Sequence, residues 1–73
     1  MGELAGFNYR EAARRLRALG FRFDRGAKGS HEIWRHQDGR RTTVPHHPGD
    51  IPEGTMRAIL KAGGIDKQAF LAA

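Results

Sequence analysis

The dipeptide Asp38-Gly39 restricts the fold more than any other feature of the sequence, because strand-like segments flank it on both sides. Residues 31–36 (HEIWRH) and 41–44 (RTTV) are typical of short strands, and Pro45 follows the second one. An Asp-Gly pair favours a two-residue hairpin loop, in which both positions need positive φ. The sequence therefore predicts two neighbouring antiparallel strands joined by a tight turn.

A helix and another strand precede this hairpin. Asn8 can cap the helix, and Glu11 stands three residues later, where its side chain can bond back. Apolar residues then recur at the spacing of one helix face, at Ala12, Leu16 and Leu19. Gly20 is placed to end the helix, and residues 21–25 (FRFDR) alternate as in a half-buried strand.

The last third of the chain has helical periodicity. One apolar face is formed by Met56, Ile59, Leu60 and Gly63. Gly63-Gly64 ends this helix, and Asp66 can cap a short final turn over residues 67–71 that Phe70 docks. The order α-β-β-β-α predicts a small α+β domain, in which helices cover one face of a three-stranded antiparallel sheet.

Length and cysteine content limit the class of protein. Seventy-three residues predict one domain over residues 1–73, with residues 1–6 as a flexible N-terminal extension. The absence of cysteine excludes disulfides, thiolate nucleophiles and cysteine-based zinc sites. No apolar run approaches the roughly 20 residues that cross a bilayer, and no signal peptide is visible. We therefore expect a cytoplasmic protein without a membrane partner.

The charge balance favours an anionic partner. Thirteen Lys and Arg residues against eight Asp and Glu give a formal net charge of +5. Such an excess attracts nucleic acid most often, and sometimes a membrane or an acidic protein. A solvated basic surface without a partner would have the same composition.

Strand alternation relates the side chains of residues 31–36 to one another. If Trp34 points into the core, then His31, Ile33 and Arg35 point to solvent. We prefer this register because an indole gains more from burial than an imidazole does. Ile33 would then be an exposed apolar residue beside His31.

Most catalytic motifs are absent. His46 and His47 are adjacent and would point to opposite sides, and no carboxylate or cysteine spacing completes a metal site. Residues 26–29 are too short for a phosphate-binding loop and precede a strand, so no cofactor is expected. Ser30 and His31 are neighbours in sequence, which does not make them a catalytic pair.

What remains is a lone histidine beside a glycine-containing loop and two cations. Histidine is the side chain type best suited to giving or taking a proton at physiological pH, and backbone amides around Gly29 could cradle a phosphate with Lys28 and Arg35 nearby. That set suits RNA cleavage, in which the substrate's own 2′-hydroxyl is the nucleophile. From the residues alone, a purely structural role for His31 is the competing interpretation.

Several motifs, with their spacing, carry a family resemblance. They are Ala27-Lys28-Gly29-Ser30-His31, Trp34, Asp38-Gly39-Arg40, Val44-Pro45, Ile51-Pro52-Glu53-Gly54-Thr55 and the tail from Ile59 to Ile65. Over about residues 9 to 65 the chain resembles the HicA (YcfA-like) toxin family. The resemblance implies a double-stranded-RNA-binding-like fold and a metal-independent endoribonuclease that cleaves mRNA. The catalytic histidine of the family's Gly-Ser-His motif corresponds to His31.

The resemblance also implies a HicB-like antitoxin in a bacterial type II toxin-antitoxin pair. We expect a toxin that is monomeric alone and oligomeric through this antitoxin. Contacts with RNA are predicted for Lys28, Gly29, Ser30, Arg35 and Arg40. Contacts with the antitoxin are predicted for Lys28, His31, Ile33 and Arg35. A non-catalytic RNA-binding module is the alternative, and a domain that binds only an acidic protein is a third possibility.

Overall fold

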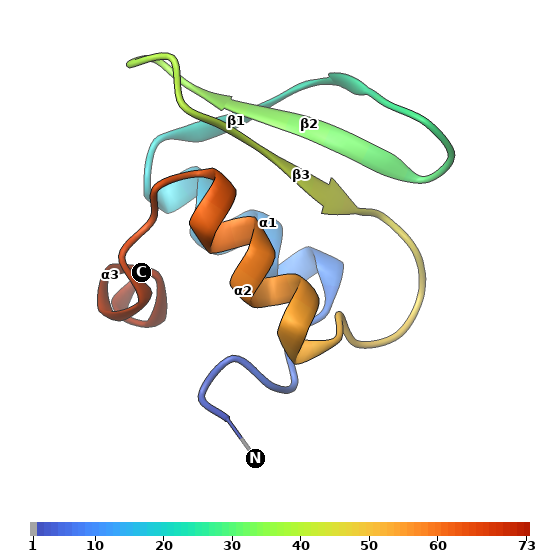
Figure 1. The fold of residues 1–73 in the computed structure, drawn as a ribbon, viewed down its shortest axis with the longest axis vertical. Helices are drawn as coiled ribbons and strands as arrows, with labels where there is room; N and C mark the ends of the chain where they lie inside the picture. The colour runs from blue at the N-terminus through green and yellow to red at the C-terminus, as the bar shows by residue number, and fades with distance from the viewer. Residues whose placement is uncertain (1) are drawn as a thin grey trace.

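The computed structural model describes residues 2–73, and the predicted α-β-β-β-α order is confirmed, with a short helix added at the end (Figure 1). The elements are α1 (Tyr9–Ala18), β1 (Phe21–Gly26), β2 (His31–His36), β3 (Arg41–Pro45), α2 (Glu53–Ala62) and α3 (Lys67–Ala72). None of the helices within residues 2–73 is long and apolar enough to cross a membrane.

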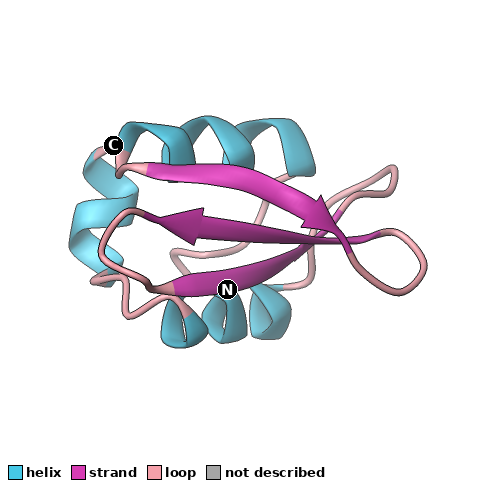
Figure 2. Ribbon diagram, turned by 90° about the horizontal axis from the view of Figure 1, so that it is seen from above, coloured by secondary structure: helices cyan, strands magenta, loops and turns pink. Residues whose placement is uncertain are grey.

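The three strands form one antiparallel sheet in the order β1-β2-β3. Helices α1 and α2 lie on the same side of this sheet, under β1 and β3 respectively (Figures 1 and 2). Figure 2 looks onto the opposite face of the sheet, which no helix of the described residues covers. The fold therefore has one packed face and one open face.

The core lies between the sheet and the helices, and it confirms the predicted strand register. Trp34 is 0% exposed, whereas His31 is exposed. The largest of the other fully buried side chains are Phe21, Phe70, Leu16, Ile51, Met56 and Val44. Phe23 departs from the expected alternation: it faces Trp34 across the sheet but is 54% exposed. Its strand, β1, is an edge strand with a register shift between Phe23 and Arg25, so Phe23 shares only an edge contact with the indole, at a centroid distance of 6.4 Å.

The turn between β2 and β3 differs from the predicted two-residue hairpin. Gly39 has φ +97°, but among residues 2–73 only glycines have positive φ, so the expectation for Asp38 was wrong. The Gly39 N–H donates to the His36 carbonyl at 3.0 Å, and the His36 N–H donates to the Arg40 carbonyl at 2.8 Å. The loop thus has three residues, with glycine alone in the left-handed position. Asp38 instead accepts a hydrogen bond from the Arg40 N–H at 3.0 Å.

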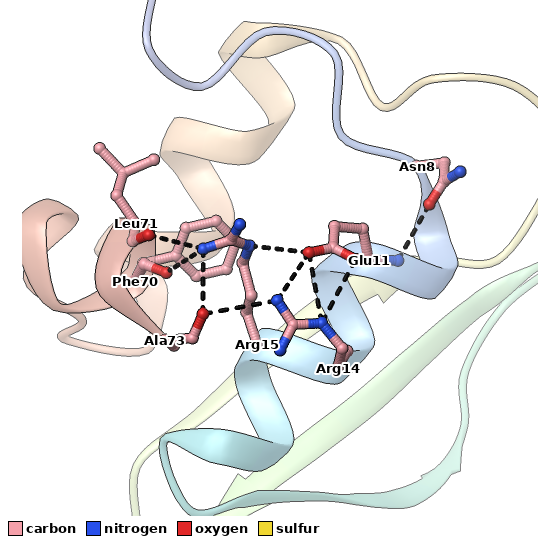
Figure 3. A network of polar contacts seen from close by, with 7 residues as sticks. All are labelled: Asn8, Glu11, Arg14, Arg15, Phe70, Leu71 and Ala73. Atoms are coloured by element: carbon pink, nitrogen blue, oxygen red, sulfur yellow. Dashed lines mark hydrogen bonds and ion pairs between the residues drawn. The ribbon is translucent and has the colours of Figure 1, made fainter.

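Asn8 caps α1 as predicted, because its Oδ1 accepts from the Glu11 N–H at 2.9 Å (Figure 3). The Glu11 carboxylate was expected to bond back to the cap. It binds Arg14 at 2.8 Å and Arg15 at 3.1 Å. The two arginines follow at i+3 and i+4 on the same helix, where side chains meet.

Arg15 also connects α1 to the C-terminus of the chain (Figure 3). Its guanidinium lies 5.1 Å from the Phe7 ring centroid. Its Nη1 donates to the backbone carbonyls of Phe70, Leu71 and Ala73. These carbonyls lie at the end of α3, where among residues 2–73 only that of Phe70 also accepts from a backbone N–H, that of Ala73, so one arginine closes this end of the helix.

The segment before α1 contributes to the core. Leu4 is 3% exposed, and Glu3 forms an ion pair with Lys67 of α3 at 2.8 Å. The flexibility expected for residues 1–6 stays a prediction for the segment as a whole, and Met1 lies outside the described residues. Leu4 and Glu3 both anchor this segment to the domain.

Candidate functional site

His31 is the first residue of β2, at the point where the loop becomes a strand. Its N–H donates to the Lys28 carbonyl at 3.3 Å, and its carbonyl accepts from the Ala27 N–H at 2.8 Å. Because Trp34 points to the helices, alternation turns the His31 side chain to the open face. Within residues 2–73 the imidazole has no hydrogen-bond partner, so it is free to meet a ligand.

The loop that precedes His31 is exposed from Ala27 through Ser30. Gly29 adopts φ +65°, and open space surrounds the position where a side chain would start. The Ser30 carbonyl accepts from the His46 N–H at 2.9 Å, which ties the loop to the segment after β3. The structure therefore brings Lys28, Gly29 and Ser30 next to His31, with their backbone accessible.

Ile33 and Arg35 share the open face with His31, as alternation along β2 requires. Arg35 is exposed, about 13 Å from His31 at roughly 3.3 Å per residue. Ile33 is half-buried, so the expectation of an exposed apolar residue was wrong in degree. Arg25 and Thr43 stand opposite it on the two neighbouring strands.

Arg40 lies at the other end of the sheet from His31. It follows the β2–β3 loop and stands opposite His36, which is five residues and so about 16 Å along β2 from His31. Its guanidinium donates to the carbonyls of Gly63 and Gly64 at 3.1 and 3.0 Å, and stands 5.4 Å from the Phe21 ring centroid. These contacts hold the end of α2, and an RNA contact of Arg40 stays a prediction.

A second polar cluster lies at the His31 end of the sheet, on the side of the helices, and sequence reasoning missed it. The Glu32 carboxylate accepts from the Tyr9 hydroxyl at 2.8 Å and from the Trp34 indole N–H at 3.1 Å. Its other oxygen lies 2.9 Å from Nδ1 of His46. The Tyr9 and His46 rings stack at a centroid distance of 3.7 Å, with planes 8° apart.

The cluster changes the titration of its members. Burial alone would raise the pKa of Glu32, but hydrogen bonds from Tyr9, His46 and Trp34 outweigh it and lower that pKa. The pKa of Tyr9 rises to about 12, first because of burial and then because its hydroxyl is bonded to the Glu32 carboxylate. The carboxylate is therefore ionised and the phenol neutral at physiological pH.

Chemically, this cluster resembles a carboxylate-oriented histidine. With Nδ1 of His46 on Glu32, the Nε2 atom is the one left for another partner, and the side chain is 54% exposed. An open hollow of about 380 Å³ borders it, lined by Asn8, Tyr9, Arg10, His46, His47, Pro48 and Gly49. One signal was available: the register that buries Trp34 also turns Glu32 inward, where a carboxylate needs partners.

The four histidines do not converge. Residues 2–73 contain no group of three or more His, Asp or Glu side chains placed to hold a metal ion. His31 and His46 lie at the same end of the sheet but on opposite faces, since Pro45 pairs with His31 and the ring of His46 stacks on Tyr9 of α1. His36 stands at the other end of β2, 3.1 Å from Asp38.

Comparison with known protein families identifies the domain. The family model described as "HicA toxin of bacterial toxin-antitoxin" matches residues 9–65, which is most of the 73-residue chain and includes α1, the whole sheet and α2. No match was found among curated proteins. The matched segment contains the Gly29-Ser30-His31 motif on its exposed loop. The chain therefore belongs to the HicA family of toxins of bacterial toxin-antitoxin systems.

Proposed function

We propose that this toxin is an endoribonuclease that cleaves mRNA without a metal ion, with His31 as the group that transfers the proton. The observation that carries the proposal is the position of His31 within the family match, at the strand end where an exposed loop meets the open face. An imidazole without an internal partner is available to a substrate. We expect the toxin to act in the cytoplasm, where its mRNA substrates are found.

The reaction needs little from the protein. His31 takes the proton of the substrate's 2′-hydroxyl, the 2′ oxygen forms a bond to phosphorus, and the bond from phosphorus to the 5′ oxygen breaks. The leaving 5′ oxygen takes up a proton from water, and the products are a 2′,3′-cyclic phosphate and a 5′-hydroxyl. Lys28 and the amides around Gly29 would stabilise the charge that builds up on the phosphate oxygens. General base catalysis of this kind contributes about 10² to 10⁴ in rate.

RNA binding without cleavage is the second candidate, and one observation favours it. A general base is usually oriented by another group, and His31 has no such hydrogen bond within residues 2–73. In this case the open face would hold RNA, and toxicity would follow from sequestering the message.

An active ribonuclease of this size cannot close its own site, so we propose that a HicB-like antitoxin covers it. Lys28 lies in the loop before β2, and His31, Ile33 and Arg35 follow along the open face of that strand, where an acidic surface would meet them. Hydrogen exchange on the complex tests this, and we expect protection of β2 and the loop over residues 26–30. Protection confined to α3 would contradict this mode of inhibition.

Cleavage of RNA in the presence of EDTA tests the catalytic assignment. We expect His31→Ala and His31→Gln to lose cutting and growth inhibition while circular dichroism stays that of the wild type, because an exposed side chain contributes little to stability. His46→Ala is the matched variant, since it removes the imidazole held by Glu32. If His46→Ala lost cutting and a folded His31→Ala kept full activity, the catalytic group would be His46, on the helix side of the sheet, and not His31.

A further inference from the structure

Three arginines stand side by side across the open face of the sheet. Arg22 of β1 pairs with Arg35 of β2, and Arg35 pairs with Arg41 of β3. Directly paired residues of antiparallel strands project to the same face, with Cβ atoms about 5 Å apart. All three side chains are exposed, and the face they share is the one without helices. The row spans the full width of the sheet, about 10 Å.

The charges of this arginine row are not compensated. Within residues 2–73 no carboxylate lies within 4.0 Å of Arg22, Arg35 or Arg41, whereas five other arginines form ion pairs: Arg14, Arg15, Arg25, Arg40 and Arg57. Like charges that face each other across strands destabilise a sheet. The row therefore carries an electrostatic cost in the free protein that a bound anion would relieve.

Arg22 shows how one end of the row is positioned. Its Nη1 donates to the carbonyls of Arg17 and Phe21 at 2.9 and 2.8 Å. The Arg17 carbonyl belongs to α1, so these bonds draw the guanidinium to the β1 edge of the sheet, and because both carbonyls are neutral its charge stays unpaired. Guanidinium groups bind phosphate oxygens through paired N–H donors, which suits them to a nucleic acid backbone.

The row is also continuous with the candidate catalytic residue. Arg35 and His31 lie on the same face of the same strand, four residues apart, with Ile33 between them. The row runs across the strands, so an RNA bound on it must turn at Arg35 to follow β2 to His31, about 13 Å away, with half-buried Ile33 beneath a base. An acidic protein would satisfy the same charges, but the substrate itself must lie on this face if His31 cuts it.

We propose that Arg35 and Arg41, with Arg22 at the β1 edge, bind phosphates of single-stranded RNA on the open sheet face and hold it so that it reaches His31 along β2. This inference rests on the proposed function, and it places the substrate on the open sheet face. Two or three phosphates on the row would give a salt dependence of affinity with a slope of roughly −1.4 to −2.1 from the row alone.

Fluorescence anisotropy with a labelled single-stranded 12-nucleotide RNA tests the proposal. The binding experiments use a His31→Ala background, so that the probe stays intact. We expect Arg35→Gln and Arg41→Gln each to weaken binding about three- to tenfold and to reduce the salt slope by about 0.7. Lys61→Gln removes an exposed cation of α2 that has no ion pair within residues 2–73, and it should change affinity less than twofold. Arg22→Gln is not used as the deciding variant, because it also removes hydrogen bonds to α1.

The outcomes separate this inference from the proposed function. Unchanged RNA affinity in the Arg35→Gln, Arg41→Gln double variant would overturn the assignment of the arginine row to RNA. If that variant lost antitoxin binding alone, the row would instead be a contact for an acidic protein. Equal competition by duplex RNA would overturn the single-strand assignment. If the wild type binds RNA through the arginine row but does not cleave it, the proposed function is contradicted and the inference about the row is not.

Discussion

At the scale of single residues, Thr42 shows how a polar side chain is accommodated in the core of this domain. It is 3% exposed, in a strand position that usually carries an apolar residue, and its hydroxyl donates to the Ile59 carbonyl at 2.7 Å. That carbonyl also accepts from the Gly63 N–H at 3.1 Å, at the end of α2. This hydroxyl thus joins β3 to α2, and the buried donor has a partner.

Substitution of Thr42 by valine should reveal the value of this bond. Valine has the same shape but no donor, so we expect Thr42→Val to lower the free energy of unfolding by about 1 kcal/mol. Thr43→Val is the control, because Thr43 is exposed and should change stability by less than about 0.5 kcal/mol. Urea denaturation measures both, and equal effects would contradict a role for the Thr42 hydroxyl.

The raised pKa of Tyr9 predicts how the stability of the fold changes at alkaline pH. It is the only tyrosine of the chain, and its pKa is raised to about 12 in the folded protein from the ordinary tyrosine value of 10.0. Between these values the folded state binds more protons than the unfolded state, so stability falls as the pH rises. The contribution of Tyr9 is complete below about pH 10 and is lost as the pH passes about 12.

Two measurements check this prediction. Phenolate absorbance reports the titration of Tyr9 directly, and we expect a midpoint well above 10 in the folded protein. Urea denaturation at increasing alkaline pH should show a decline in stability that Tyr9→Phe reduces. A normal phenolate midpoint would mean that the bond to Glu32 does not hold in solution.

At the scale of an element, the β2–β3 hairpin depends on one glycine. Gly39 has φ +97° in open space, so a methyl group would meet no atom but would force a left-handed conformation on an L-residue. We expect Gly39→Ala to lower the free energy of unfolding by about 1 to 2 kcal/mol. Gly26→Ala, also in open space but without positive φ, should be near neutral or stabilising. Equal stability of the two variants would argue against the three-residue loop.

At the scale of the whole molecule, the domain extends beyond the segment that matches its family. The match ends at residue 65, but α3 places Phe70 in the core at 0% exposure and receives Arg15 at its end. Removing Phe70 would open a cavity between α1 and α3. The last eight residues therefore belong to the folded unit and not to a tail.

Two phenylalanines allow a matched test of this conclusion. Phe70→Ala should lower the free energy of unfolding by about 3 to 5 kcal/mol, as for other buried aromatic side chains. Phe23→Ala makes the same chemical change where the side chain is 54% exposed, and should cost less than about 1 kcal/mol. Thermal unfolding of both variants is the measurement, and a mild effect at Phe70 would show that α3 is dispensable.

The sequence by itself determined the elements and the orientation of β2. Local periodicity, the caps at Asn8 and Asp66 and the size of Trp34 were sufficient, because each depends on neighbouring residues and on burial of the largest side chain. The same reasoning placed His31 on the solvent side. Membership of the family could likewise be recognised from motifs and their spacing.

Only the tertiary structure decided which distant residues meet. Tyr9, Glu32 and His46 come from three separate parts of the chain, and no local pattern brings their side chains together. The arginine row depends on the register of two strand pairings, and period-2 alternation states which face a residue occupies but not which residue stands opposite. The exposure of Phe23 also depends on where the sheet ends, because an edge strand has a neighbour on one side only.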